Sequence, residues 1–290
     1  MIETFNKFNC PISMTSPLKR IQEHPSEAKR LIGIEYEQFL SLVALVQIRH
    51  QQKQEEMELN KVRINLAGGG RKPGMLADTG VCLCLVYLRQ QPIFEILGLL
   101  FDVSKTKAHD AFHSWSEILR EILPASQIEE VENDLIAYAE LRQKVTEYQL
   151  IVDSEEQPTA RPVDYQEQKN YYSGKKKMHT LKNQLIVLPD GTDIIDVTVG
   201  EFGKTSDINL FRMNQDKFDL TQKFLGDKAY VGEGAITTPT KKPRNGELTE
   251  NQLLSNKELS SQRIVVEHLI GKLKIFRVAE RQIPAGSFSI

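Results

Sequence analysis

The chain changes character at a short apolar run that ends on an acid, Tyr148-Gln-Leu-Ile-Val-Asp153. From there on, strand-like stretches separated by Gly and Pro turn signals occupy 148–153, 179–188, 192–199 and 223–227. A helix-like stretch at 205–213 precedes the fourth strand, and a strong helical pattern covers about 260–277. This order predicts an α/β domain, in which a mixed sheet with flanking helices carries a ligand site at the ends of its strands.

The part of the chain before this run has the periodicity of helices. Helical patterns cover 34–59, 76–90 and 93–101, and Ser104 is a candidate N-cap for a further helix to about Ile122. A Gly-rich joint at 67–73 interrupts the pattern, and an acidic helical segment follows at 127–147. We therefore predict an N-terminal helical segment over 1–66, an all-α helix-turn-helix region over 67–124, a linker helix over 125–147 and the α/β domain over 148–290.

The composition is that of an ordinary globular protein, with 40% hydrophobic and 26% charged residues. The formal net charge of -2 excludes a polycation, so contact with nucleic acid would need local basic clusters. One such cluster, Lys175-Lys176-Lys177, lies in the stretch 169–189, which has no acidic residue and is suited to backbone phosphate. There is no signal-peptide pattern and no apolar run of membrane-spanning length, which predicts a cytoplasmic protein.

Three carboxylates stand where the predicted elements could bring them together. Asp153 and Asp227 follow strand-like runs, and Glu267 lies on the last predicted helix. Hard divalent cations such as Mg²⁺ prefer oxygen ligands, so three carboxylates can hold such ions without His or Cys. We predict that these three acids are both catalytic residues and metal ligands. Asp207 is the rival for the second position, although an acid at the start of a helix is also explained by the helix dipole.

The helix around Glu267 carries further information. At about 100° per residue, Arg263 and Lys274 fall within roughly 40° of Glu267 on the helix surface. This stripe places one carboxylate between two cations, which suits simultaneous binding of a metal ion and a phosphate backbone. A solvated amphipathic face has the same pattern, and only the two aspartates favour the functional interpretation.

Residues 93–120 have the pattern of a helix-turn-helix, with a short helix, a tight turn at 102–104 and a longer helix. On the longer helix, residues at helical spacing are predicted to face the core, namely Ala108, Phe112, Trp115 and Leu119. Residues near its N-terminus are the candidates for reading base edges, namely Ser104, Lys105, Thr106 and His109. A plain helical bundle would give a similar pattern.

Several motifs taken together resemble one family. The helix motif Arg263-xxx-Glu267-xxxxxx-Lys274 is similar to the signature helix of DDE transposases of bacterial insertion sequences. Similar stretches of that family are seen at Leu225-Gly-Asp227-Lys-Ala-Tyr230, at Tyr171-Tyr-Ser-Gly-Lys-Lys-Lys-Met-His179 and at Gly203-Lys-Thr-Ser-Asp207. The resemblance covers about residues 34–277 and is to the insertion-sequence type related to the Harbinger group. Ser260 departs from the family, which commonly has a Tyr at that position.

The resemblance implies an RNase H-like catalytic domain that requires Mg²⁺, as two ions for which Mn²⁺ could substitute. It also implies a DNA transposase that binds the terminal inverted repeats of its element, hydrolyses a phosphodiester and transfers a strand to target DNA. A homodimer on double-stranded DNA, associated with the nucleoid, is expected. The alternative is a catalytically inactive or truncated copy that acts only as a DNA-binding protein or repressor.

Overall fold

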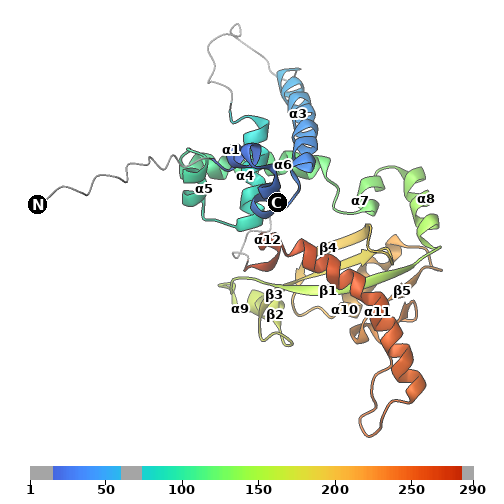
Figure 1. Cartoon of the computed structure of the whole chain (residues 1–290). Coiled ribbons are helices and arrows are strands. Elements are labelled where there is room, and N and C mark those ends of the chain that lie inside the picture. The colour runs from blue at the N-terminus through green and yellow to red at the C-terminus, as the bar shows by residue number, and fades with distance from the viewer. Residues whose placement is uncertain (1–15, 60–73, 283–290) are drawn as a thin grey trace, which may run out of the picture. The chain divides into compact units, whose positions relative to one another are not determined.

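The structure, a computed structural model, describes residues 16–59 and 74–282. It divides into two compact units, Met1–Ile122 and Leu123–Ile290, which are taken separately below (Figure 1). The Gly-rich joint predicted at 67–73 lies outside the described residues. The predicted combination of a helical N-terminal region and an α/β C-terminal region is confirmed.

Unit 1 is all helical in the part that is described. Its α-helices are α1 (Pro17–Glu23), α2 (Ala28–Ile32), α3 (Tyr36–Leu59), α4 (Ala77–Gln90), α5 (Phe94–Leu100) and α6 (Lys105–Ile122). The last four were predicted within a few residues of these bounds. Helices α1 and α2 were not predicted. They have 7 and 5 residues, which are too few to show a periodic pattern.

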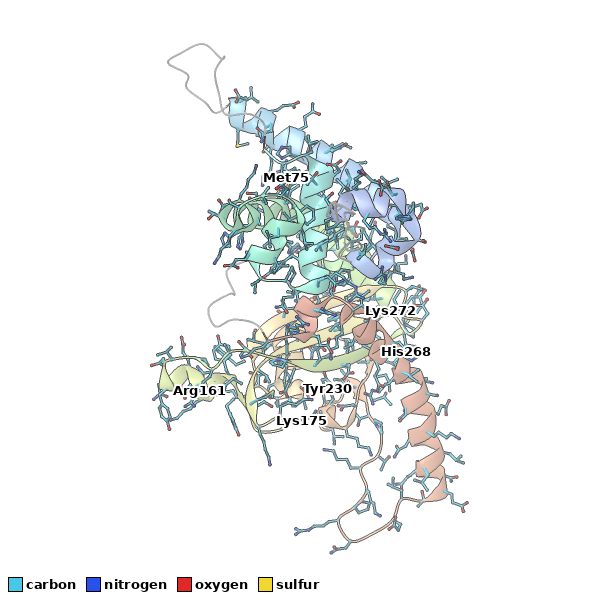
Figure 2. The ribbon with its side chains drawn as sticks, turned by 60° about the vertical axis from the view of Figure 1, so that its left-hand side comes forward. Met75, Arg161, Lys175, Tyr230, His268 and Lys272 are labelled. Atoms are coloured by element: carbon cyan, nitrogen blue, oxygen red, sulfur yellow. The ribbon has the colours of Figure 1, made fainter. Side chains whose placement is uncertain are left out.

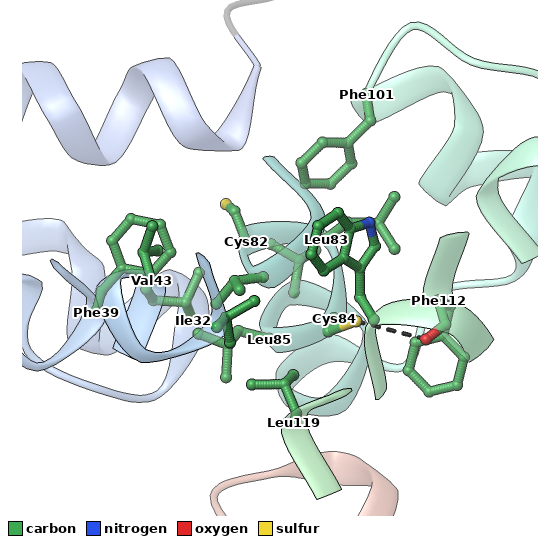
Figure 3. Packing of buried hydrophobic residues seen from close by; sticks show 14 of the residues in the cluster. Ile32, Phe39, Val43, Cys82, Leu83, Cys84, Leu85, Phe101, Phe112 and Leu119 are labelled. Carbon is green, nitrogen blue, oxygen red and sulfur yellow. Dashed lines mark hydrogen bonds between the residues drawn. The ribbon is translucent and has the colours of Figure 1, made fainter. Parts of the chain in front are cut away.

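One hydrophobic core holds these helices together (Figure 3). Trp115 of α6 is 5% exposed and packs so closely on α4 that a Cβ at Gly80 would lie 2.3 Å from its indole ring. This confirms that Trp115 is a core residue. Phe39 and Val43 of α3 belong to the same core, so helices assigned above to the separate segments 1–66 and 67–124 pack together. The domain boundaries themselves stay predictions.

Two cysteines lie in this core. Cys82 and Cys84 of α4 are fully buried, and the Cys84 thiol donates to the Phe112 carbonyl oxygen at 3.6 Å. Burial raises the pKa of each thiol to about 12. Both side chains therefore remain protonated and serve as small core residues rather than nucleophiles.

Unit 2 is built on a mixed sheet. Its main strands are β1 (Gln149–Pro158), β3 (Met178–Val187), β4 (Ile194–Phe202), β5 (Lys223–Leu225) and β6 (Ile236–Thr237), and a short β2 (Tyr172–Ser173) pairs with the start of β3. β3 runs antiparallel to both β1 and β4. β5 lies between β1 and β6 and pairs in parallel with each of them. Three antiparallel strands are thus continued by two short parallel ones, with β1 in the middle.

Helices cover both faces of this sheet. One face packs on α7 (Gln127–Val131), α8 (Leu135–Val145) and α10 (Asp207–Asn214), through a core that includes Val152 and Phe211. The other face packs on α11 (Glu250–Leu273), which crosses the strands in Figure 1. We call these the α10 face and the α11 face. Smaller helices α9 (Tyr165–Tyr171) and α12 (Arg277–Glu280) lie at the ends of β1 and β3.

Three predicted elements are corrected by the structure. β1 does not end at Asp153 but continues to Pro158, because its polar second half still pairs with β3. The last helix begins at Glu250 rather than near 260 and ends at Leu273, since Thr249 caps its start through a capping box with Gln252. The acidic segment 127–147 forms two helices instead of one.

No single helix in the described ranges is long and apolar enough to cross a membrane. The pair Pro25–Ile32 and Tyr36–Leu59 meets the criteria of length and composition only when its two members, bent by 72°, are taken together.

Candidate functional site

Asp153 and Asp227 are neighbours across two parallel strands. Ile151 of β1 pairs with Leu225, the last residue of β5, and Asp153 and Asp227 each follow two residues later in their segments. Side chains alternate along a strand, so both aspartates point to the face that carries Ile151 and Leu225. These two apolar residues pack against α11, which places both carboxylates on the α11 face.

Helix α11 brings the third carboxylate to the same face. Its buried residues Val266 and Ile270 pack on Ile151 and Leu225, which fixes how the helix lies across the strands. Glu267 follows Val266 directly, and its side chain is 58% exposed and 3.7 Å from the Arg263 guanidinium. Figure 2 labels His268 and Lys272 on the same stretch of helix.

The electrostatics of Asp153 show that these groups are close to one another. The pKa of the Asp153 carboxyl is raised to about 6, chiefly by burial, with smaller contributions from the nearby charges of Asp227 and Glu267. The Arg263 guanidinium opposes this shift, and the backbone N–H of Ser154, which donates to Asp153 at 3.0 Å, does so too. Asp153 is therefore a carboxylate whose negative charge is only partly compensated by the protein itself.

The donor atoms suit a hard divalent cation. Asp153 accepts from the Ser154 N–H through Oδ1, and Asp227 accepts from the Ala229 N–H at 2.7 Å through Oδ1. Among the described hydrogen bonds, none involves Oδ2 of either aspartate; Asp153 lies on β1 and Asp227 lies two residues after β5. Within the part of the chain that the structure describes, no three acidic, His or Cys side chains are gathered tightly enough to hold a metal ion. The exposed Glu267 side chain, turned toward Arg263, is the member that stands apart.

Asp207 lies on the other side of the sheet. It is the first residue of α10, and its Oδ1 accepts from Lys182 Nζ at 2.7 Å. Lys182 is buried and also lies 3.9 Å from Glu156 of β1. Because Glu156 and Asp153 differ by an odd number of positions along β1, they point to opposite faces. Asp207 thus belongs to a buried ion cluster on the α10 face and does not reach Asp153 through the sheet.

A buried tyrosine links the segments that carry the two aspartates. Tyr230 is fully buried, three residues after Asp227, and its hydroxyl lies 2.7 Å from Ser154 Oγ, which follows Asp153 (Figure 2). Gln184 of β3 donates to the same hydroxyl at 3.1 Å. Tyr230 lies in the family-like motif at 225–230, but no role was predicted for it. Its hydrogen bonds fix the loop after β5 against β1.

The two cations of the helix stripe differ in their surroundings. Arg263 is 13% exposed and faces the carboxylates, whereas Lys274 is the C-cap residue of α11. Lys274 Nζ lies 2.6 Å from Oε2 of Glu155, which is two residues beyond Asp153 on the α11 face. Lys274 therefore forms an intramolecular ion pair that connects the end of α11 to β1. Glu155 was not among the predicted site residues, because an acid in the polar half of a strand has no distinguishing sequence pattern.

The lysine cluster at 175–177 lies far from Asp153. These residues form the exposed turn between β2 and β3, with Lys177 in the left-handed region at φ 56° (Figure 2). Asp153 pairs with Leu185, seven residues along β3 from Met178. At about 3.3 Å per residue this is roughly 23 Å. The lysines can therefore contact DNA only well away from the carboxylates.

The helix-turn-helix has the tight turn that was predicted. Val103 N–H donates to the Gly98 carbonyl at 2.9 Å, and a Cβ at Gly98 would lie 2.6 Å from the Val103 oxygen, so only glycine fits. Asp102 adopts the left-handed conformation at φ 54°. Ser104 Oγ then accepts from the Lys107 N–H at 3.2 Å, which confirms Ser104 as the N-cap of α6.

The candidate base-reading residues on α6 are exposed. Lys105 Nζ lies 2.5 Å from Glu95 of α5, and the His109 ring packs edge-on against Phe94 at 5.0 Å between centroids. Ser104 is engaged as the cap, which leaves Thr106 as the predicted residue with the freest side chain. Lys107, exposed on the same turn, was not among the predicted residues.

Comparison with known proteins agrees with both units. A family model described as DDE superfamily endonuclease matches residues 152–288, and one described as helix-turn-helix of DDE superfamily endonuclease matches residues 78–125. A probable transposase for insertion sequence element IS702 from Microchaete diplosiphon is 29% identical over 259 residues. These residues make up 88% of this chain and 85% of that relative.

Solved structures of Mos1 transposase complexes are similar at a lower level. A pre-cleavage Mos1 transpososome is 10% identical, with 78% of this chain and 84% of that chain covered and a TM-score of 0.18. A Mos1 paired-end complex with left transposon end is also 10% identical, with 80% and 87% covered and a TM-score of 0.19. Scores this low carry no structural argument.

The C-terminal unit is thus a mixed sheet with flanking helices, and it follows a helical region. The two family matches and the likeness to an insertion-sequence transposase together support a DDE transposase of an insertion sequence with a helix-turn-helix domain. Its relation to the Harbinger group stays a prediction.

Proposed function

We propose that this transposase binds the terminal inverted repeats of its own element and cleaves a phosphodiester at their ends, with Asp153, Asp227 and Glu267 as its metal ligands. The freed 3′-hydroxyl is then joined to target DNA. The observation that supports the proposal is the pairing of Ile151 with Leu225, each two residues before one of the aspartates, on the face crossed by the helix of Glu267.

The three carboxylates would hold Mg²⁺, as two ions, with Mn²⁺ as a substitute. When bound, these ions supply positive charge to the attacking and leaving oxygens of a phosphodiester. Asp153 and Asp227 offer fixed oxygens, because the backbone N–H groups of Ser154 and Ala229 hold their carboxylates in place. Glu267 joins them by a rotation of its exposed side chain away from Arg263. That movement also frees Arg263 to face a phosphate.

The remaining predicted contacts serve to hold DNA. Arg263 lies next to the carboxylates and contacts the phosphate nearest the reaction, whereas Lys274 reaches DNA only if it leaves Glu155. The exposed lysines at 175–177 contact backbone phosphate at a distance from the site. On α6, Ser104, Lys105, Thr106 and His109 lie at the edge that reads bases in the repeat. Two copies pair the two element ends, so the protein acts as a homodimer on DNA at the nucleoid.

A nicking assay tests the proposal. Full-length protein is incubated with a labelled duplex carrying one element end, with and without Mg²⁺, and nicks are mapped on a sequencing gel. Asp227→Asn is expected to abolish Mg²⁺-dependent nicking while leaving the circular dichroism spectrum unchanged. Asp207→Asn is the matched control, since it also removes one charge from an aspartate. The folded fraction of this variant is expected to keep Mg²⁺-dependent nicking.

The reverse result, with nicking lost in Asp207→Asn and kept in Asp227→Asn, would refute the assignment of the second ligand. Binding of the element end without any Mg²⁺-dependent nicking would instead support the inactive copy. All three carboxylates are present in the chain, so the active enzyme is favoured.

A further inference from the structure

The segment between β6 and α11 carries a concentration of positive charge that no predicted role has used. Residues 238–246 include Lys241, Lys242 and Arg244 and no acid. Lys242 Nζ pairs with Glu247 at 2.6 Å. Lys241 and Arg244 are exposed and have no described ion pair or hydrogen bond. These two surface cations therefore have no ion-pair or hydrogen-bond partner among the described residues.

This segment is anchored at both ends. The Thr240 N–H donates to Asn256 Oδ1 at 2.7 Å, and Asn256 Nδ2 donates back to the Thr240 carbonyl at 3.0 Å. At the other end, Thr249 and Gln252 form the capping box that starts α11. Pro243, between the cations, restricts the backbone further. A loop fixed in this way loses little conformational entropy when it binds a ligand.

The segment is connected on both sides to elements of the candidate site. It leaves the sheet from β6, the neighbour of the strand before Asp227, and it returns through α11, which carries Glu267. Figures 1 and 2 both show the first half of α11 extending past the sheet, with this loop at its tip. A nucleic-acid duplex bound to the loop would thus be held next to α11, the helix that carries Glu267.

We propose that the loop 238–249, braced by Asn256, is a binding surface for the phosphate backbone of duplex DNA, with Lys241 and Arg244 as the contacting residues. This deepens the proposed function, because it names a further part of the chain that holds the DNA substrate. Contacts of this kind do not depend on base sequence, so the loop strengthens binding to any duplex equally and adds no preference for the element end.

The test measures binding of the full-length protein to a 30-base-pair duplex of random sequence, without divalent metal, over a range of salt concentrations. Each phosphate neutralised contributes about 0.9 to the slope of log affinity against log salt. The double variant Lys241→Gln, Arg244→Gln is expected to bind more weakly at low salt and to lower this slope by about 1.8, since two contacts are lost.

Two further variants separate charge from structure. The pair Lys144→Gln, Lys223→Gln removes the same charge from two exposed lysines outside the loop and is expected to keep the wild-type slope. Asn256→Ala keeps both cations but frees the loop, and it is expected to weaken binding with little change in slope.

An unchanged slope in the loop variant, or an equal loss in the Lys144 and Lys223 control, would overturn the proposal. A change in oligomeric state by light scattering, with DNA affinity unaltered, would assign the loop to a protein partner and overturn it as well. Because no metal is present, the outcome is independent of whether Asp227 is a metal ligand, which the nicking assay decides.

Discussion

The substitution Tyr230→Phe removes one buried hydroxyl. It is expected to loosen the loop that carries Asp227 without creating a cavity in the core. The aromatic ring stays, but Ser154 Oγ and Gln184 Nε2 each lose one hydrogen bond, at 2.7 Å and 3.1 Å, and keep the bond between them at 3.2 Å. The Gln184 Oε1 atom is already buried without a hydrogen bond, so this region has little capacity to satisfy further groups. At roughly 0.5–1.5 kcal/mol for each hydrogen bond, the free energy of unfolding should fall by about 1–3 kcal/mol.

The functional effect separates positioning from stability. Tyr230 touches no carboxylate oxygen, so it acts through the placement of Asp227 relative to Asp153. The Mg²⁺ concentration for half-maximal nicking is expected to rise several-fold, and saturating Mg²⁺ should restore most of the rate. Affinity for the element end, measured without metal, should not change.

Tyr138→Phe is the matched control for this prediction. Its hydroxyl donates to the Lys217 carbonyl at 3.0 Å, in the same core cluster but away from the carboxylates. It should lower stability by about 1 kcal/mol while the Mg²⁺ requirement stays at the wild-type value. The reasoning is refuted if Tyr230→Phe keeps the wild-type Mg²⁺ requirement, or if Tyr138→Phe shifts it as much.

Packing and charge lead to four further predictions. Because burial raises the pKa of Asp153 to about 6, a proton competes with metal below that pH, and Mn²⁺ affinity by calorimetry should fall about tenfold per pH unit there; Asp153→Asn should lack this dependence. In metal-free protein the same raised pKa means that the folded state binds the extra proton, so its contribution to stability falls as pH rises from about 4 to 6, and a flat urea-midpoint profile would count against the shift. Gly80→Ala puts a methyl group 2.3 Å from the Trp115 ring and should cost about 1–3 kcal/mol in urea unfolding; a neutral result would contradict the close packing. Lys182→Met leaves Asp207 without its 2.7 Å partner and should cost about 3–5 kcal/mol, while Mn²⁺ affinity of the folded protein stays unchanged; a large loss of affinity would place this cluster in the metal site.

Hydrophobic patterns located most of the sheet and failed where strands are polar. The first half of β1 is apolar and was recognised, but Ser154 to Pro158 pair with β3 through polar side chains. Two of those side chains have partners far away in the sequence: Glu155 forms an ion pair with Lys274, and Glu156 contacts Thr180 and Lys182. Such partners are distant in sequence, so no local pattern could reveal the strand. The early start of α11 could have been found from its Thr249-Glu-Asn-Gln252 capping box.

The candidate site was predictable in its residue types but not in its geometry. Strand-end acids and the resemblance of the helix motif selected Asp153, Asp227 and Glu267. The choice between Asp227 and Asp207 depends on which face of the sheet each occupies, and this is fixed by the pairing of Ile151 with Leu225. Strand register arises from contacts across the whole domain, so a single sequence could rank these two residues but could not place them.

The central claim is that the metal site lies on the α11 face between Asp153 and Asp227. Crystals of the full chain grown above pH 7 with Mn²⁺, with diffraction recorded at the Mn absorption edge, would test it directly. We predict an anomalous peak within about 2.2 Å of a carboxylate oxygen of both aspartates, with Glu267 turned toward it. A peak bound by Asp207 and Glu156 on the α10 face, with none at Asp153, would contradict the account.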